Sequence, residues 1–115
     1  MHELAVTESI LEIGLRYARQ EGAARITDLY LVIGDLSSIV DDSVQFYWEM
    51  ISQGTMAENS VLHFRRVTAA ITCQNCNHTY SIETLSLCPG CDSSQVRITA
   101  GEEFYLEAID VADGG

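Results

Sequence analysis

The 115-residue chain contains no lysine, and its six basic residues are all arginines. With 17 acidic residues, the formal net charge is −11 and the pI is about 4.3. Binding to nucleic acid depends on clustered cations that face the phosphates. The only charged residues in the segment 73–98 are Glu83, Asp92 and Arg97, which give it a net charge of −1. The composition therefore argues against a nucleic-acid-binding protein.

Long hydrophobic runs are also missing. The longest apolar run covers residues 29–33, whereas a membrane-spanning helix needs about 20 apolar residues. No basic stretch precedes an apolar run near the first residue, so the sequence predicts no signal peptide. No internal repeat is present. We expect a cytoplasmic protein that does not associate with membranes.

Only four cysteines occur, and all lie within residues 73–91. They form two pairs, Cys73-Gln-Asn-Cys76 and Cys88-Pro-Gly-Cys91, with eleven residues between the pairs. Two cysteines three positions apart can place both sulfurs on one metal ion, and two such turns make a closed tetrahedral site of the kind that zinc prefers. The spacing predicts a structural zinc ion bound by these four residues.

Two other uses of these cysteines are disfavoured. Disulfides are unexpected because thiols stay reduced in the cytosol. A redox dithiol would need one Cys-x-x-Cys pair at the start of a helix, not two pairs in a loop-rich segment. His78, two residues after Cys76, stays open as a replacement ligand, a donor to a sulfur or a polar turn residue.

Two helices are predicted outside the cysteine-rich segment. Residues 4–21 carry apolar residues at helical spacing, and Gly22 follows as a stop signal. The second helix is expected to begin with Asp41 or Asp42 as its cap and to end near Gln53. The expected buried faces are Val6, Ile10, Ile13 and Tyr17 in the first helix, and Val44, Tyr47, Trp48 and Ile51 in the second.

Three strands are predicted at residues 25–34, 61–67 and 103–111, and the last must pair back with the first two. Three strands and two helices predict an α+β fold class, a three-stranded sheet covered by two helices in a two-layer unit. This unit would comprise residues 1–70 and 100–112. A zinc-ribbon module, residues 71–99, would be inserted between two of its strands.

The sequence begins Met1-His2-Glu3, which offers a second metal site. A free α-amine, the His2 amide nitrogen and the His2 ring can chelate one metal in fused rings. They supply three nitrogens of a square plane, a geometry that Ni(II) and Cu(II) favour. Glu3 or the Asp41-Asp42 pair could supply a fourth ligand. The ordinary alternative is that His2 is simply an exposed residue.

Several short motifs occur in one order along the chain. They are MHE at 1–3, IGDLS at 33–37, FYWE at 46–49, GT at 54–55 and the two Cys-x-x-Cys pairs. Together they resemble the HypA/HybF family of hydrogenase/urease nickel-incorporation proteins, over essentially the whole chain. Asp35 and Ser38 depart from the family pattern, which usually has glutamate and glycine there.

The resemblance implies a nickel metallochaperone and not an enzyme. It implies Ni(II) as cargo, bound by residues matching Met1, His2 and Glu3, with Asp41 matching a loop aspartate near that site. Zinc ligands match the four cysteines. The family acts with a HypB-type GTPase and delivers nickel to the large-subunit precursor of nickel–iron hydrogenase; some members also serve urease accessory proteins. Both a monomer and a homodimer are compatible with the sequence.

Two rival functions and one surface hypothesis follow from the residues themselves. A zinc-ribbon adaptor for nucleic acid conflicts with the acidity, and a metal-dependent hydrolase needs an open metal position that four cysteines do not leave. Four apolar or aromatic residues are interpreted either as part of the core or as a contact surface for the GTPase partner. They are Tyr30, Val32, Tyr47 and Trp48.

Overall fold

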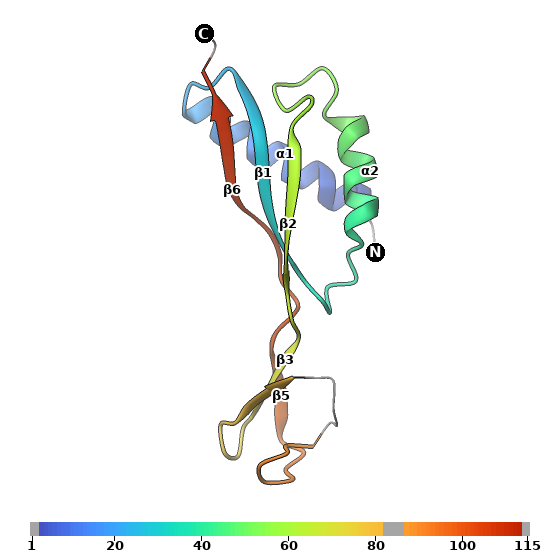
Figure 1. Cartoon of the computed structure of the whole chain (residues 1–115), viewed down its shortest axis with the longest axis vertical. Helices are drawn as coiled ribbons and strands as arrows, with labels where there is room; N and C mark the ends of the chain where they lie inside the picture. Colours follow the sequence, from blue (N-terminus) through green and yellow to red (C-terminus); the bar gives the residue numbers. More distant parts are fainter. Residues whose placement is uncertain (1–2, 82–86, 114–115) are drawn as a thin grey trace.

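The computed structural model describes residues 3–81 and 87–113. Figure 1 shows two sheets arranged end to end along a molecule of 60 × 25 × 16 Å. The elements in chain order are α1 (Glu3–Gln20), β1 (Arg25–Gly34), α2 (Asp41–Ile51), β2 (Val61–Val67), β3 (Ala70–Cys73), β4 (Thr79–Ser81), β5 (Val96–Ala100) and β6 (Phe104–Ala112).

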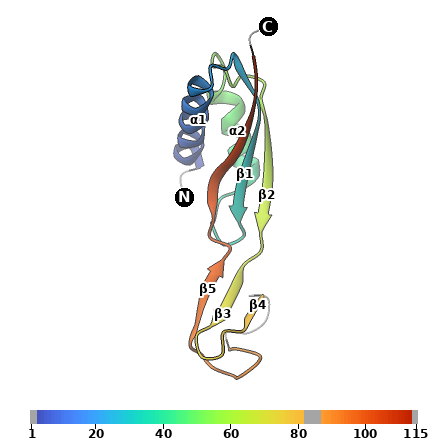
Figure 2. The same ribbon diagram turned by 90° about the vertical axis from the view of Figure 1, so that its left-hand side faces the viewer.

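The larger sheet has the strand order β2-β1-β6. β1 is parallel to β2 and antiparallel to β6, so the last strand pairs back with the first, as predicted. Both helices lie on one face of this sheet, seen edge-on in Figure 2. The predicted fold class, a three-stranded sheet with two helices plus a separate cysteine-rich module, is confirmed.

The core lies between β1 and the two helices. Leu29, Leu31 and Ile33 alternate along β1 and are fully buried, because the central strand has helices above it and strands on both sides. Trp48 from α2 is also buried, and its indole N–H donates to the Ser60 hydroxyl over 3.0 Å. That bond satisfies the one polar atom the ring brings into the core.

The buried stripe of α1 differs from the predicted one. It runs through Thr7, Ile10, Gly14 and Ala18, whereas Tyr17 is 55% exposed. Gly14 lets the helix approach the sheet, since a Cβ there would lie 3.3 Å from Leu29 Cδ2. The prediction holds at Ile10 and fails at Tyr17, because the buried stripe continues through Gly14 and Ala18.

The start of α2 also differs from expectation. The N-cap is Val40, and no side chain caps the helix, so the predicted caps at Asp41 and Asp42 are wrong. Asp41 instead forms an ion pair with Arg66, with Oδ1 3.2 Å from Nη2, and Asp35 lies 3.8 Å from the same guanidinium. Arg66 on β2 thus links the loop after β1 to the first residue of α2.

Strand β6 contains an irregularity that the alternating pattern did not predict. Tyr30 pairs with Ala108 and Leu31 with Leu106, so Glu107 has no partner in the register. The extra residue moves Ala108 off the apolar face, and Ile109 packs against the core instead. A strict alternation from Phe104 therefore fails after Leu106.

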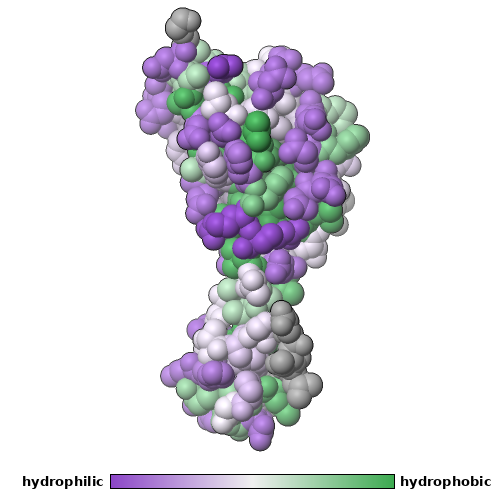
Figure 3. All heavy atoms as spheres, viewed as in Figure 1, coloured by the Kyte–Doolittle hydropathy of each residue, from purple (hydrophilic) through white to green (hydrophobic). Residues whose placement is uncertain are grey.

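The face of the sheet opposite the helices carries a band of charged side chains (Figure 3). Arg65 on β2 and Glu107 on β6 form an ion pair of 2.9 Å across β1, and hydrophilic atoms cross this face above the narrow junction in Figure 3. Val32 beneath them is fully buried, as is Trp48 in the core. These two residues are therefore removed from the predicted contact surface for a partner.

The second sheet has the order β4-β3-β5 and is antiparallel. Strands β3 and β5 are additional to the three strands that the sequence predicts. The division into units of residues 1–70 with 100–112 and of residues 71–99 stays a prediction.

The junction between the sheets requires glycine. A Cβ on Gly34 would lie 2.1 Å from the carbonyl oxygen of Gly101, which itself has φ of +110°. The loop after β1 is bonded to both connecting segments, because Asp35 N–H donates to Val67 and Leu36 N–H donates to Gly101. The junction is therefore close-packed backbone.

We expect Gly34→Ala to destabilise the protein by about 3 kcal/mol, because the methyl group meets backbone that has nowhere to move. Gly22→Ala is the matched control: Gly22 has φ of +68° and no atom within 4 Å of an added Cβ, so only backbone strain of about 1 kcal/mol applies. Denaturant midpoints measure both variants. Equal losses would show that crowding at the junction is unimportant.

Candidate metal centre

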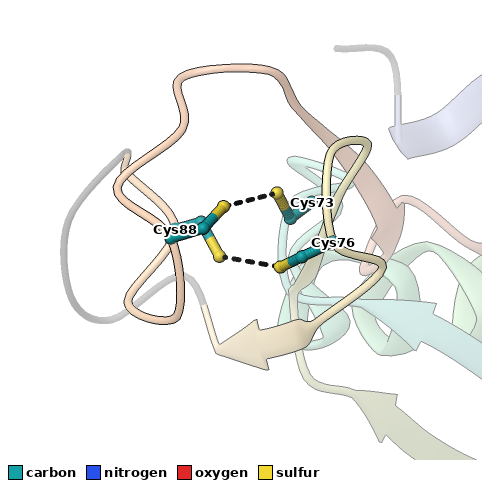
Figure 4. Close-up of side chains that lie close together, drawn as sticks. Cys73, Cys76 and Cys88 are labelled. Atoms are coloured by element: carbon teal, nitrogen blue, oxygen red, sulfur yellow. Dashed lines mark hydrogen bonds between the residues drawn. The ribbon is translucent and has the colours of Figure 1, made fainter.

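The four cysteines meet at the far end of the smaller sheet. Their sulfurs all lie within 4.8 Å of one another, and none of the four forms a disulfide. Figure 4 shows Cys73, Cys76 and Cys88 with their sulfurs turned toward one another from two facing loops. The predicted ligand set is thus brought together in one cluster.

The first pair sits in a tight turn at the end of β3. The Asn75 N–H donates to Cys73 Sγ over 3.3 Å, and the Asn77 N–H donates to the Cys73 carbonyl over 2.9 Å. Asn77 has φ of 61°, a left-handed conformation that asparagine tolerates well. The Cys73 N–H donates to the carbonyl of His78, which closes the turn.

The second pair repeats this turn bond for bond. The Gly90 N–H donates to Cys88 Sγ over 3.3 Å, and the Asp92 N–H donates to the Cys88 carbonyl over 2.7 Å. Asp92 has φ of 59°, and the Cys88 N–H donates to the carbonyl of Ser93. Two equivalent turns that face each other can present four thiolates to a single ion.

The thiol pKa values of Cys73 and Cys76 are shifted in opposite directions by their surroundings. Burial raises the pKa of the Cys73 thiol, but N–H groups of Cys76 and Asn75, and hydrogen bonds with the neighbouring thiols, lower it to about 6. For Cys76, the His78 N–H lowers the pKa, yet the hydrogen bond to Cys88, burial and the other thiols raise it to about 12. Adjacent thiolates repel one another, so a cation is needed to keep all four deprotonated.

Tyr80 on β4 supplies an independent test of whether a metal suits this cluster. Its hydroxyl is buried and has no hydrogen-bond partner among the described residues, which costs about 1–3 kcal/mol. Burial and the charges of the four cysteines raise the pKa of this hydroxyl. A thiolate held on a cation would be an acceptor for a neutral phenol O–H, so the surroundings fit a charged metal–thiolate cluster.

His78 lies beside this cluster, and its ring stacks on Tyr80 with centroids 5.9 Å apart. It is exposed and does not belong to the group of four candidate ligands. The donor set of four sulfurs is complete without it and is typical of structural zinc. These residues would hold zinc as a structural ion, since four protein ligands leave no position for a substrate.

The predicted nickel residues, Met1, His2, Glu3 and Asp41, all precede the cysteine-rich segment in the sequence. Met1 and His2 fall outside the described residues. Glu3 is the first residue of α1, and its carbonyl accepts a hydrogen bond from the buried Thr7 hydroxyl. Asp41 is paired with Arg66, as described above. Within residues 3–81 and 87–113, the cysteine cluster is the one group of three or more candidate metal ligands.

Sequence reasoning missed Tyr80 and Arg66. Tyr80 lies between the two cysteine pairs, and no sequence signal shows that its hydroxyl would be buried without a partner. The partner of Arg66 depends on how β2 approaches the start of α2.

None of the described helices is long and apolar enough to cross a membrane.

Fold and site together define a two-layer α/β protein that carries a four-cysteine module of the zinc-ribbon type. Comparisons with known proteins identify the family. The model of the family "Hydrogenase/urease nickel incorporation, metallochaperone, hypA" matches residues 1–111. The chain therefore belongs to the HypA family: it is a nickel-incorporation metallochaperone and not an enzyme, which confirms the family and the function predicted from the motifs.

Individual relatives agree with this assignment. A hydrogenase maturation factor HypA from Dehalococcoides mccartyi strain CBDB1 is 39% identical over 114 residues, covering 98% of this chain and 96% of the relative. A HypA from Rhizobium leguminosarum bv. viciae is 34% identical over 112 residues, covering 96% and 99%.

Two solved structures share the fold. The solution structure of the Ni metallochaperone HypA from Helicobacter pylori has a TM-score of 0.70 at 22% identity, covering 98% of this chain and 99% of that one. A second structure, entitled "Solution structure of HypA protein", has a TM-score of 0.78 at 23% identity and covers 96% of each chain.

Cys91→Ser should release zinc and unfold residues 73–98, because the turns would lose the ion that holds them together. The helices and the larger sheet should persist, since their core is separate. Metal analysis with amide hydrogen exchange measures both effects. His78→Ala is the control and should retain zinc. One equivalent of zinc in Cys91→Ser, lost when His78 is also replaced, would make His78 a ligand.

Tyr80→Phe should speed zinc loss to a competing chelator and weaken zinc binding about tenfold, because it removes the buried O–H that would donate to a thiolate of the metal-bound cluster. Tyr105→Phe is the matched control, since Tyr105 lies half-exposed on β6. If both variants retained zinc equally well, the Tyr80 hydroxyl would have no role at the cluster.

Proposed function

We propose that this metallochaperone binds Ni(II) through the α-amine of Met1, the amide and ring of His2, and the carboxylate of Glu3. The observation that carries the proposal is the sequence Met1-His2-Glu3 directly at the start of α1, which begins at Glu3. In this proposal the zinc held by the four cysteines is structural and stays bound.

The proposed recipient is the large-subunit precursor of nickel–iron hydrogenase, reached together with a HypB-type GTPase. Family membership supports partners in hydrogenase or urease maturation. A net charge of −11 without any lysine supports protein partners and disfavours nucleic acid. The reduced state expected of the four free thiols supports a cytoplasmic location.

A carrier of nickel must also release it. Three nitrogen donors at a chain terminus form an accessible site, whereas four cysteines enclose their ion. We therefore assign exchangeable nickel to the terminus and permanent zinc to the cysteines. Protons compete for the amine and imidazole donors, so nickel binding should weaken as the pH falls.

His2→Ala, or acetylation of Met1, should weaken nickel binding severely while zinc content and helicity stay unchanged, because each removes a nitrogen donor. Nickel titration of the untagged protein beside these two forms measures the effect. Equal affinity in all three would exclude the terminal site, and His63, His78 or the thiolates would become the candidates.

Asp41→Asn should weaken nickel binding about tenfold or less if the carboxylate only supports the site. Arg66→Gln is the matched variant, because it breaks the same ion pair and leaves the carboxylate in place. A loss in Asp41→Asn alone assigns the effect to the carboxylate. Similar losses in both would mean that the ion pair acts by holding the start of α2.

A further inference from the structure

Helix α1 extends beyond the edge of the sheet that it covers (Figure 1). In Figure 1 the C-terminal end of α1 projects past β6, on the side away from β1. β6 is the edge of the sheet in the order β2-β1-β6. The last turns of the helix therefore extend over a position that no strand of the described chain occupies.

A groove of about 540 Å³ lies at this position, between the end of α1 and the edge of β6. Tyr17, which the helical pattern assigned to a buried face, lines it and is 55% exposed. The wall contributed by β6 includes the apolar residues Leu106, Ile109 and Val111. Glu107 of β6 also lines the groove, and its carboxylate is paired with Arg65. A strand placed beside β6 would cover Tyr17 and complete the burial that the sequence pattern predicts.

The backbone along this edge is available for pairing. The Ala112 carbonyl accepts from the Ala24 N–H, and the Asp110 carbonyl accepts from the Thr27 hydroxyl, so both face β1. Neighbouring residues of a strand alternate in direction. The N–H groups of Ile109 and Val111 therefore face outward, toward the groove.

Charge decides which kind of strand fits. Glu21 and Asp113 line the groove, and neither forms an ion pair within the described residues. Two copies of this chain joined along β6 would bring acidic groups together, which is unfavourable for opposed strands. A basic strand would gain from the same charges, and this chain has no lysine and only six arginines to offer.

We propose that the groove between α1 and β6 receives an extended segment of a partner protein, in which apolar residues alternate with arginine or lysine. The segment adds to β6 as a fourth strand, in the manner of strand addition at an open sheet edge. Its apolar side chains contact Tyr17 and Val111, and its basic side chains meet Glu21 and Asp113. This extends the partner side of the proposed function and does not depend on the nickel ligands.

The test uses the full chain and a synthetic peptide of alternating arginine and valine, blocked at both ends. Binding should be saturable and should shift and protect the backbone amides of Ile109 and Val111 in NMR spectra. Val111→Pro removes an outward N–H without touching the pairing to β1, so it should weaken binding about tenfold relative to Val111→Ala. Glu21→Arg should also weaken binding.

The proposal is overturned if Val111→Pro and Val111→Ala bind equally, if protection appears away from β6, or if an alternating glutamate and valine peptide binds as well. Concentration-dependent protection of the same amides without peptide would assign the edge to a second copy of the chain. Nickel titration and zinc content should be unchanged in Val111→Pro. Failure of the docking proposal would thus be distinguishable from failure of the nickel assignment.

Discussion

The smaller sheet depends on four cysteine sulfurs held within 4.8 Å of one another. This sheet has almost no apolar core of its own, because beyond the junction only Ile71, Cys73 and Cys88 are buried in its described residues. Bonds from thiolates to a zinc ion can contribute on the order of 10 kcal/mol, which replaces the missing hydrophobic contacts. The two equivalent turns supply the N–H donors that stabilise charge on sulfur.

The larger sheet is stabilised differently, by a hydrophobic core. Its core of β1 and the two helices contains no metal ligand from the cysteine cluster. The two parts meet at close-packed backbone, where Gly34 touches Gly101 and the loop after β1 bonds to both connecting segments. The four cysteines and the nickel ligands proposed at Met1, His2 and Glu3 therefore share no donor.

The sequence predicted the elements whose patterns are local. The bounds of β1 and β2, the return of β6 to the sheet and the meeting of the four cysteines are all confirmed. It failed where tertiary contacts decide: the exposure of Tyr17 follows from where the sheet ends, and the irregularity at Glu107 follows from pairing with β1. The short strands β3 and β5 were missed because they hold too few residues for an alternating pattern.

Metal stoichiometry of the untagged protein tests the central claim of two separate metal sites most directly. One zinc per chain should survive a chelator that strips added nickel, and one further equivalent of nickel should bind without displacing zinc. His2→Ala should lose the nickel and keep the zinc. Displacement of zinc by nickel, or a full equivalent of chelator-resistant nickel in His2→Ala, would contradict the account.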